Sequence, residues 1–473
     1  MDGTVSFLQT PGFPPSHATI RQRSAENAQN VVSQGTNHAF AHSPSMSARK
    51  AADKGTEEME MRLTLLDGFR GFFLLFMMIA HVNGSFHAVL GDYNHHMLGW
   101  VEDAQGFVFI SGFVVGLVYT KILDRKGPAG MGGAVLRRIR TIYTYQALMI
   151  VAFCAAALGL AAWGLEPDIL SQYVQNPAAF TTASLLLVTG SLHMGILALY
   201  IWLMLLTPFA LMAFHKGWAK WWAVASIAAW TLAQSGLPDA AQLPIERVLA
   251  NAGHGINIGI YFNVFGWQIL YFLGLFLGFL FARDQLDTSF LRTPRMRAMF
   301  WLAVAGVVAF AVFDRAMSLG WIEKDLRSTL WREIDRGNMH IVYLMNFLLD
   351  LFVIAWLLVA GPSSGNRALA FLGRGIEWLY TRRPLVFLGQ HSLQVFTAHL
   401  VMTYFIMWAM AGRDLPALWD NLLMLLSIGA LFVVAWGHAT LQSMSRDRSR
   451  NSAVLEKGPV PQQGRVANPS TTT

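Results

Sequence analysis

The chain has 473 residues, of which 54% are hydrophobic and only 13% are charged, and its mean hydropathy is +0.41. A soluble domain carries roughly 25% charged residues, so this composition excludes an ordinary soluble protein and indicates a chain that lies mostly in a bilayer. The net charge of +7 does not require nucleic acid, because cytoplasmic loops rich in Lys and Arg explain it in a membrane protein. A single cysteine, Cys154, excludes an intrachain disulfide framework.

Polar segments stand at both ends of the sequence. Residues 1–61 are rich in Ser, Ala, Gln and Asn and contain no apolar core of the kind that a signal peptide needs. They predict a disordered cytoplasmic tail. Residues 442–473 are charged and then rich in Pro, Ser and Thr, and they predict a second tail of the same kind. The transmembrane domain is expected between the two tails, over residues 62–441.

Apolar runs of about membrane length recur through this central region and predict an all-α polytopic helix bundle with about ten transmembrane helices. The expected spans are residues 70–90, 104–120, 142–163, 194–214, 218–234, 262–281, 298–313, 340–360, 385–411 and 420–440, of which the fifth and seventh are short. Most of the 35 Lys and Arg residues then fall on one side, which favours both termini in the cytoplasm and the bacterial inner membrane as the location. On the other side, residues 314–339 are expected to form a solvated cap.

Two ionisable residues in the first span suggest chemistry. The span begins Asp67-Gly68-Phe69-Arg70-Gly71 and reaches His81. From Arg70 to His81 an α-helix makes three turns plus about 20°, so both side chains share one face, about 16 Å apart along the axis. An arginine at the cytoplasmic mouth suits a phosphorylated donor, and a histidine past mid-membrane suits a general base. The alternatives are a boundary anchor paired with Asp67 for Arg70, and an interhelical hydrogen bond for His81.

Three further polar residues lie within the later predicted spans. Asp350 lies in the eighth span, four residues after Asn346, where a carboxylate is costly unless it is paired or protonated. It is a candidate to orient a histidine or to line the acceptor path, with a structural interhelical bond as the alternative. His391 and His399 lie in the ninth span, about 80° apart around the axis. They either line an acyl channel or hold helices together.

Other patterns argue against metal and nucleotide sites. His95 and His96 are adjacent and point to different sides, and no second pair completes a metal site. The glycine-rich stretch Gly127–Gly133 lacks a strand–loop–helix context and a Walker lysine, so it does not predict a nucleotide loop. The basic tails are read as determinants of topology, and no nucleic-acid partner is expected.

Three elements of the sequence resemble the acyltransferase-3 superfamily. Arg-x10-His in a first span after Asp-Gly-Phe resembles its signature. Phe109-Ile110-Ser111-Gly112-Phe113 resembles its Phe-x-Ser-Gly-Phe element, and Arg137-Arg138-Ile139-Arg140 resembles its basic run at the cytoplasmic face.

Within that superfamily the chain is most similar to the OpgC branch, the glucan succinyltransferases, over roughly residues 62–440. The resemblance rests on Asp103–Gly112, Trp267–Leu270 and Leu388–Leu393. The chain departs from the branch at Met194–Tyr200, which lacks the acid and the proline of Met-Asp-Ile-Leu-Pro-Leu-Tyr. That departure bears on the identity of the donor or the acceptor more than on the class of reaction.

The resemblance implies transfer of an acyl group, expected to be succinyl, from cytoplasmic acyl-CoA to hydroxyls of a periplasmic glucan or another glycan, with no tightly bound cofactor. Arg70, together with Arg137, Arg138 and Arg140, would hold the phosphates of the CoA donor. His81 would accept the proton of the sugar hydroxyl, Ser111 would stabilise the oxyanion, and Asp67 would orient Arg70. Asp103, at the outer surface, is a candidate for acceptor binding. The alternative function is a transporter or flippase for a glycan or lipid-linked sugar, although no internal repeat supports it.

Overall fold

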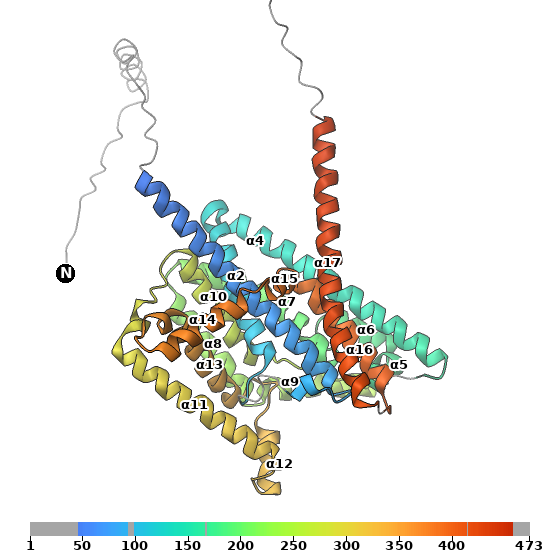
Figure 1. Cartoon of the computed structure of the whole chain (residues 1–473). Coiled ribbons are helices and arrows are strands. Elements are labelled where there is room, and N and C mark those ends of the chain that lie inside the picture. The colour runs from blue at the N-terminus through green and yellow to red at the C-terminus, as the bar shows by residue number, and fades with distance from the viewer. Residues whose placement is uncertain (1–45, 93–98, 166–167, 414, 457–473) are drawn as a thin grey trace, which may run out of the picture. The chain divides into compact units, whose positions relative to one another are not determined.

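The computed structural model describes residues 46–92, 99–165, 168–413 and 415–456, and throughout these ranges the secondary structure is helical (Figure 1). The chain divides into two compact units, Met1–Met59 and Glu60–Thr473, and the site lies within the second. The α-helices are α2 (Met46–Asn83), α3 (Val89–Asp92), α4 (Asp103–Ala162), α5 (Ser171–Gln175), α6 (Pro177–Leu185), α7 (Gly195–His215), α8 (Ala219–Gln234), α9 (Leu237–Asn251), α10 (Val264–Ala282), α11 (Pro294–Ser318), α12 (Lys324–Glu333), α13 (Ile341–Val359), α14 (Arg367–Tyr380), α15 (Arg383–Gln390), α16 (Ser392–Met410) and α17 (Ala417–Glu456). Four short 3₁₀ helices lie between them, at Asp168–Leu170, Leu192–Met194, Ser289–Arg292 and Gly361–Ser363.

Eight helices among the described residues are long and apolar enough to cross a bilayer, so the chain is a multi-pass membrane protein. They are α4, α7, α10, α11, α13 and α16, with the parts Leu63–Asn83 of α2 and Ala417–Ser445 of α17. The predicted all-helical bundle is therefore confirmed. The number of crossings and the side of each terminus stay predictions.

The second and third predicted spans belong to the single 60-residue element α4. This element bends at Gly127, whose φ of 68° lies in the left-handed region, directly before Pro128. The fifth predicted span corresponds to α8, which has 16 residues and is shorter than the eight apolar helices.

Several boundaries differ from the sequence-based expectation. The first apolar span begins at Leu63 rather than at residue 70, and α11 has 25 residues where a short span was expected. The ninth predicted span is broken at His391 into α15 and α16. Helix α2 begins at Met46 and α17 ends at Glu456, so both extend into the predicted tails. The remaining tail residues, 1–45 and 457–473, lie outside the described residues.

Helices α4 and α10 are in backbone contact through four glycines. A Cβ atom at Gly112 or Gly116 of α4 would overlap a carbonyl oxygen of α10, and one at Gly274 or Gly278 of α10 would overlap a carbonyl oxygen of α4. Each helix therefore presents a Gly-x-x-x-Gly pair to the other, which is the pattern that lets membrane helices approach closely. The contacts run in the same order along both helices, so α4 and α10 begin at the same end of the bundle.

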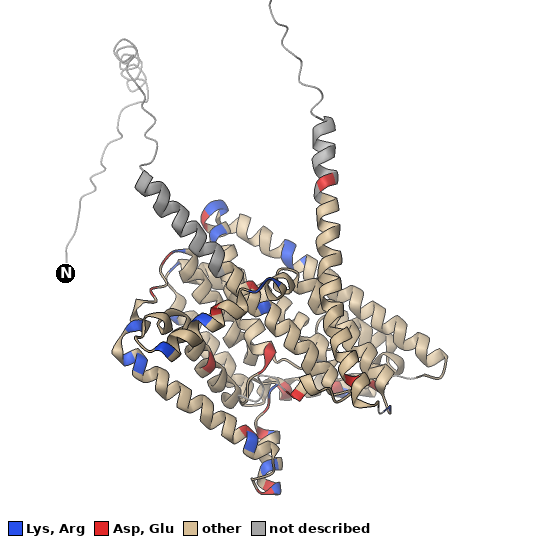
Figure 2. Cartoon of the chain, viewed as in Figure 1, with Lys and Arg blue, Asp and Glu red and all other residues tan. Residues whose placement is uncertain are grey.

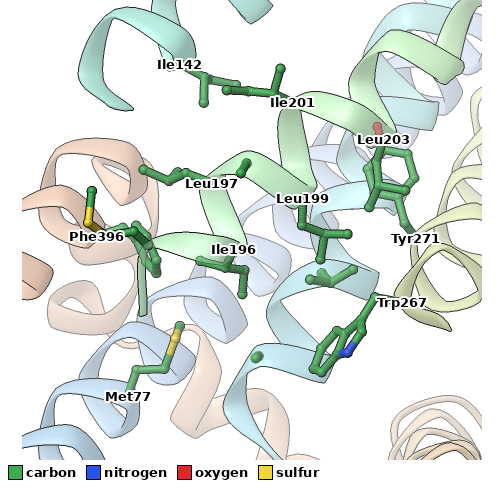
Figure 3. Packing of buried hydrophobic residues seen from close by; sticks show 14 of the residues in the cluster. Met77, Ile142, Ile196, Leu197, Leu199, Ile201, Leu203, Trp267, Tyr271 and Phe396 are labelled. Carbon is green, nitrogen blue, oxygen red and sulfur yellow. The ribbon is translucent and has the colours of Figure 1, made fainter. Parts of the chain in front are cut away.

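Helix α7 lies in the middle of the buried apolar cluster. Figure 3 shows its residues between Ile142 of α4, Trp267 and Tyr271 of α10, and Phe396 of α16. Tyr271 satisfies its hydroxyl within this cluster through a 2.7 Å hydrogen bond with Thr207 of α7. The packing of α7 against three other helices fixes the walls of the candidate site described below.

Charged residues are concentrated at few places in this unit. Figure 2 shows Lys and Arg at the bend of α4 and at the beginning of α11, whereas both signs of charge gather around α12. Helix α12 lies within residues 314–339, the segment that the sequence analysis expects to form a solvated cap.

Candidate functional site

Arg70 lies in the second turn of the apolar part of α2, and its side chain is 16% exposed. It donates from Nη2 to the hydroxyl of Ser392, the first residue of α16, and from Nη1 to Asp67 Oδ1 at 3.4 Å. The expected contact between Asp67 and Arg70 is therefore present. The Arg70 side chain is mostly buried, and its contact with Asp67 fits both the donor-binding role and the boundary anchor paired with Asp67.

Glycines allow α2 to come close enough for these contacts. A Cβ atom at Gly71 would overlap the carbonyl oxygen of Leu385 in α15, and one at Gly389 would overlap the carbonyl oxygen of Asp67. This close approach places the break between α15 and α16 beside Arg70. A buried guanidinium is tolerated only where acceptors satisfy it, and the break supplies one of them, the Ser392 hydroxyl.

Arg70 opens onto a pocket that three of the predicted site residues share. Arg70, Ser111 and Arg138 line this pocket together with Tyr200, Ser392 and Phe396, and the remaining walls are apolar. The empty space in and around the pocket, including space open to solvent, is about 520 Å³. Its residues come from α2, both halves of α4, α7 and α16, so the tertiary fold brings together groups that are far apart in the sequence.

The polar part of this pocket is electropositive. Two guanidinium groups line it, and the N-terminus of the 19-residue helix α16 adds the partial positive charge of a helix dipole at Ser392. Such an arrangement attracts an anionic or strongly polarised ligand. The other two arginines of the predicted basic run, Arg137 and Arg140, are exposed on α4 and do not line the pocket.

His81 lies near the other end of α2 and belongs to a cluster of three histidines. Its Nδ1 lies 2.9 Å from Nε2 of His399, which is fully buried on α16. The ring of His193, from the 3₁₀ helix before α7, packs against the His81 ring with centroids 4.4 Å apart. His193 in turn meets Tyr404 edge to face at 5.7 Å.

The protonation of this cluster is constrained by its surroundings. Burial, and to a lesser extent the positive charge of Arg336, lowers the pKa of His193 to about 4, so His193 is neutral at pH 7. The hydrogen bond between His81 and His399 needs one ring nitrogen that carries a proton and one that does not. At least one of these two imidazoles is therefore neutral whenever the bond is formed.

The described residues contain no group of three or more His, Cys, Asp or Glu placed to hold a metal ion. The histidines of the cluster are packed by ring contacts and do not converge on one point. His95 and His96, the pair that the sequence analysis considered for metal binding, lie outside the described residues.

Phe396 connects the pocket with the histidine cluster. Its ring lines the pocket beside Phe107, with centroids 5.9 Å apart, and it also meets the His399 ring at 5.5 Å. His81 is not part of the pocket lining. Arg70 and His81 are therefore on one helix and near one pocket, with Phe396 at the border between the pocket and the cluster.

The other predicted candidates lie elsewhere in the fold. Asp103 is buried at the beginning of α4. Asp350 accepts a 2.7 Å hydrogen bond from Asn346 in the same helix, so its bond is intrahelical. His391 lies at the break between α15 and α16, and its Nδ1 is 2.9 Å from Nδ1 of His438 on α17. None of these residues lines the Arg70 pocket.

Sequence reasoning missed His193 and Tyr200 as residues of the site. His193 directly precedes the Met194–Tyr200 segment, and no spacing in the sequence relates it to His81 or His399. Tyr200 and Ser392 belong to segments quoted for the resemblance, but nothing in their spacing indicates that they line the same pocket as Arg70. Only contacts between distant helices reveal this.

Comparison with known proteins agrees with the resemblance seen in the sequence. Searches among curated proteins and among solved structures find no significant match. The family model of the OpgC protein matches residues 62–443, which include all the helices that form the pocket and the histidine cluster. The chain therefore belongs to the OpgC protein family, which is linked to the succinylation of periplasmic glucans.

Proposed function

We propose that the chain is a membrane-embedded O-acyltransferase that moves a succinyl group from cytoplasmic succinyl-CoA to hydroxyls of a periplasmic glucan. The observation that supports this most directly is the pocket in which Arg70, Ser111 and Arg138 meet, bordered by the cluster that contains His81. The proposal places the protein in the bacterial inner membrane, with the donor arriving at the Arg138 end.

Arg138 and Arg70 hold the donor in this proposal. Arg138 is half-buried and lines the pocket, so it can meet the CoA phosphates at the mouth. Arg70 lies deeper and is already bonded to Asp67 and Ser392, which fixes its guanidinium before the donor arrives. The pantetheine arm follows the apolar walls past Phe396 and brings the thioester to the histidine cluster.

The chemical step follows from the placement of His81. If Nδ1 of His81 donates its proton to His399, Nε2 holds the lone pair and can accept the proton of the sugar hydroxyl. The hydroxyl oxygen then bonds to the thioester carbonyl carbon, and the carbonyl oxygen takes up the negative charge. The C–S bond breaks as this oxyanion collapses, and the CoA thiolate leaves with the proton from His81. Ser111 is proposed to donate to the oxyanion.

Replacement of His81 tests this proposal in cells that lack the native gene. We expect His81→Ala to leave the periplasmic glucan present but without succinyl groups, as read by mass spectrometry. His87→Ala is the matched control, because His87 is exposed and lies outside the cluster. It should give normally succinylated glucan.

Two outcomes of this experiment would contradict the proposal. Succinylated glucan in cells with His81→Ala would remove His81 from the reaction. Loss of the glucan from the periplasm, while the variant protein is still present in the membrane, would favour the transporter or flippase.

A further inference from the structure

A second and larger cavity lies away from the Arg70 pocket. The empty space in and around it, including space open to solvent, is about 1240 Å³, and it is formed by the segments before α4 and α10, the end of α11, the segment around α12 and the beginning of α13. We call it the outer cleft, because it lies beside the segment that the sequence analysis expects to form a solvated cap. The proposed function above assigns it no role.

Aromatic rings form one wall of the outer cleft. The Trp100 side chain is 3% exposed, and its ring meets those of Trp331 at 5.0 Å and Tyr343 at 5.5 Å. Trp331 lies on the polar helix α12 and is 48% exposed, so part of its ring remains accessible. A large aromatic ring that is anchored on one side and accessible on the other is suited to stacking against the C–H face of a sugar.

The Trp100 wall is held by a chain of hydrogen bonds that reaches Asp350. The backbone N–H of Trp100 donates to Asn346 Oδ1 at 2.8 Å, and the Asn346 amide donates to Asp350 at 2.7 Å. Gly99, with φ of 117°, allows this approach, because a Cβ atom there would meet Asn346. Asp350 therefore helps to fix the aromatic wall of the outer cleft.

Charged groups in the outer cleft are nearly balanced and are partly paired. Its lining includes four carboxylates and three guanidinium groups. Arg336 donates to Glu102 Oε1 at 2.9 Å and to the Tyr261 hydroxyl at 2.8 Å. Burial opposes the charge on Arg336, but Glu102 and Tyr261 outweigh it and raise the pKa of Arg336 above its ordinary value. Fixed donors and acceptors of almost zero net charge fit an uncharged ligand with many hydroxyls better than an anion.

The outer cleft and the histidine cluster lie at the same end of the bundle. Tyr261 lines the cleft. Its backbone packs against Gly195, since a Cβ atom at Gly195 would lie 3.4 Å from the Tyr261 nitrogen. Gly195 is only two residues after His193 in the sequence. The charge of Arg336, which also lines the cleft, acts on His193. A hydroxyl presented from the cleft would therefore have a short route to His81.

We propose that the outer cleft binds the acceptor, an uncharged glucan chain, with Trp331 as its stacking surface. This inference rests on the proposed function for the direction of transfer, but binding in the cleft is measured without any transfer. Once one hydroxyl has been succinylated, the sugar carries a carboxylate, and a cleft lined by more carboxylates than guanidinium groups binds it less well than the unmodified chain.

The test is binding of unsubstituted periplasmic glucan, purified from cells lacking the gene, to the full-length protein in nanodiscs, by calorimetric titration without succinyl-CoA. We expect Trp331→Ala to raise the Kd by about tenfold, the loss typical of a central aromatic contact. Trp331→Phe should recover part of the affinity. Trp321→Ala is the matched control, since Trp321 is 70% exposed and does not line the cleft, and it should bind as the native protein does.

The outcomes separate the two proposals. Equal Kd values for the native protein and for Trp331→Ala would overturn the acceptor site, even if succinylation in cells continues. Tighter binding of succinylated than of unsubstituted glucan would also overturn it. Conversely, glucan binding that depends on Trp331 in a protein that transfers no succinyl group would support the cleft while contradicting the proposed function.

Discussion

The hydrogen bond between His81 and His399 predicts that a residue outside the Arg70 pocket controls the rate of transfer. His399→Phe removes the 2.9 Å bond and keeps a ring of similar size in a fully buried position. The bond itself is worth about 0.5–1.5 kcal/mol, and a displacement of a catalytic group by about 1 Å costs about 100-fold in rate. We therefore expect kcat to fall between about twofold and 100-fold. Loss of the base in His81→Ala should cost about 10²- to 10⁴-fold.

The assay is release of CoA thiol from succinyl-CoA by the purified protein in nanodiscs with unsubstituted glucan. His399→Phe should lower kcat and leave the KM for succinyl-CoA nearly unchanged, because the donor pocket is intact. His399→Gln, whose amide can still bond to His81, should recover part of kcat. The double variant with His81→Ala should be no slower than His81→Ala alone. A native kcat in His399→Phe, at unchanged thermal stability, would refute a positioning role for His399.

Arg138→Ala should raise the KM for succinyl-CoA by about tenfold. Arg140→Ala, at an exposed position outside the pocket, should raise this KM less. Equal effects of the two variants would show that the donor site extends along the whole basic run. Gly274→Ala should destabilise the protein by about 1–3 kcal/mol through overpacking, because its Cβ overlaps the backbone of α4. The Tm in detergent should fall, whereas Gly429→Ala, whose Cβ meets nothing within 4 Å, should leave the Tm unchanged. Matching Tm values for the two variants would contradict the close contact. The pKa of His193 is about 4 in the folded protein and about 6.5 in the unfolded chain. Between pH 6.5 and pH 4 the unfolded chain therefore binds more protons than the folded protein. The free energy of unfolding should fall by up to about 3 kcal/mol over this range as the pH drops. His193→Gln should flatten that pH dependence in thermal melts, and an unchanged profile would refute the assignment.

The sequence alone predicted the parts of the structure that depend on local pattern. Hydrophobic runs predicted an all-helical membrane bundle, and helical spacing placed Arg70 and His81 on one helix with a large axial offset. The ion pair between Asp67 and Arg70 is also local, since the two residues are three apart. The functional roles assigned to these residues stay predictions, because position in a fold does not by itself demonstrate chemistry.

The sequence did not predict features that depend on contacts between distant segments. The burial of Arg70 depends on α15, more than 300 residues later in the chain, and on the bond to Ser392. His193 resembles any polar residue before a span until its ring is seen against His81. Hydropathy likewise could not locate the break at His391, because α15 and α16 are both apolar.

The reciprocal glycine contacts between α4 and α10 have a mechanical consequence. Helices whose backbones touch at successive turns cannot slide past one another without collision, so this pair should behave as one stiff block. Ser111 directly precedes Gly112, and Trp267 of α10 is bonded to the carbonyl of Gly337 beside the outer cleft. Any widening that admits a donor must then come from displacement of α2, α7, α16 or the part of α4 after Gly127, which carries Arg138, against this stiff pair.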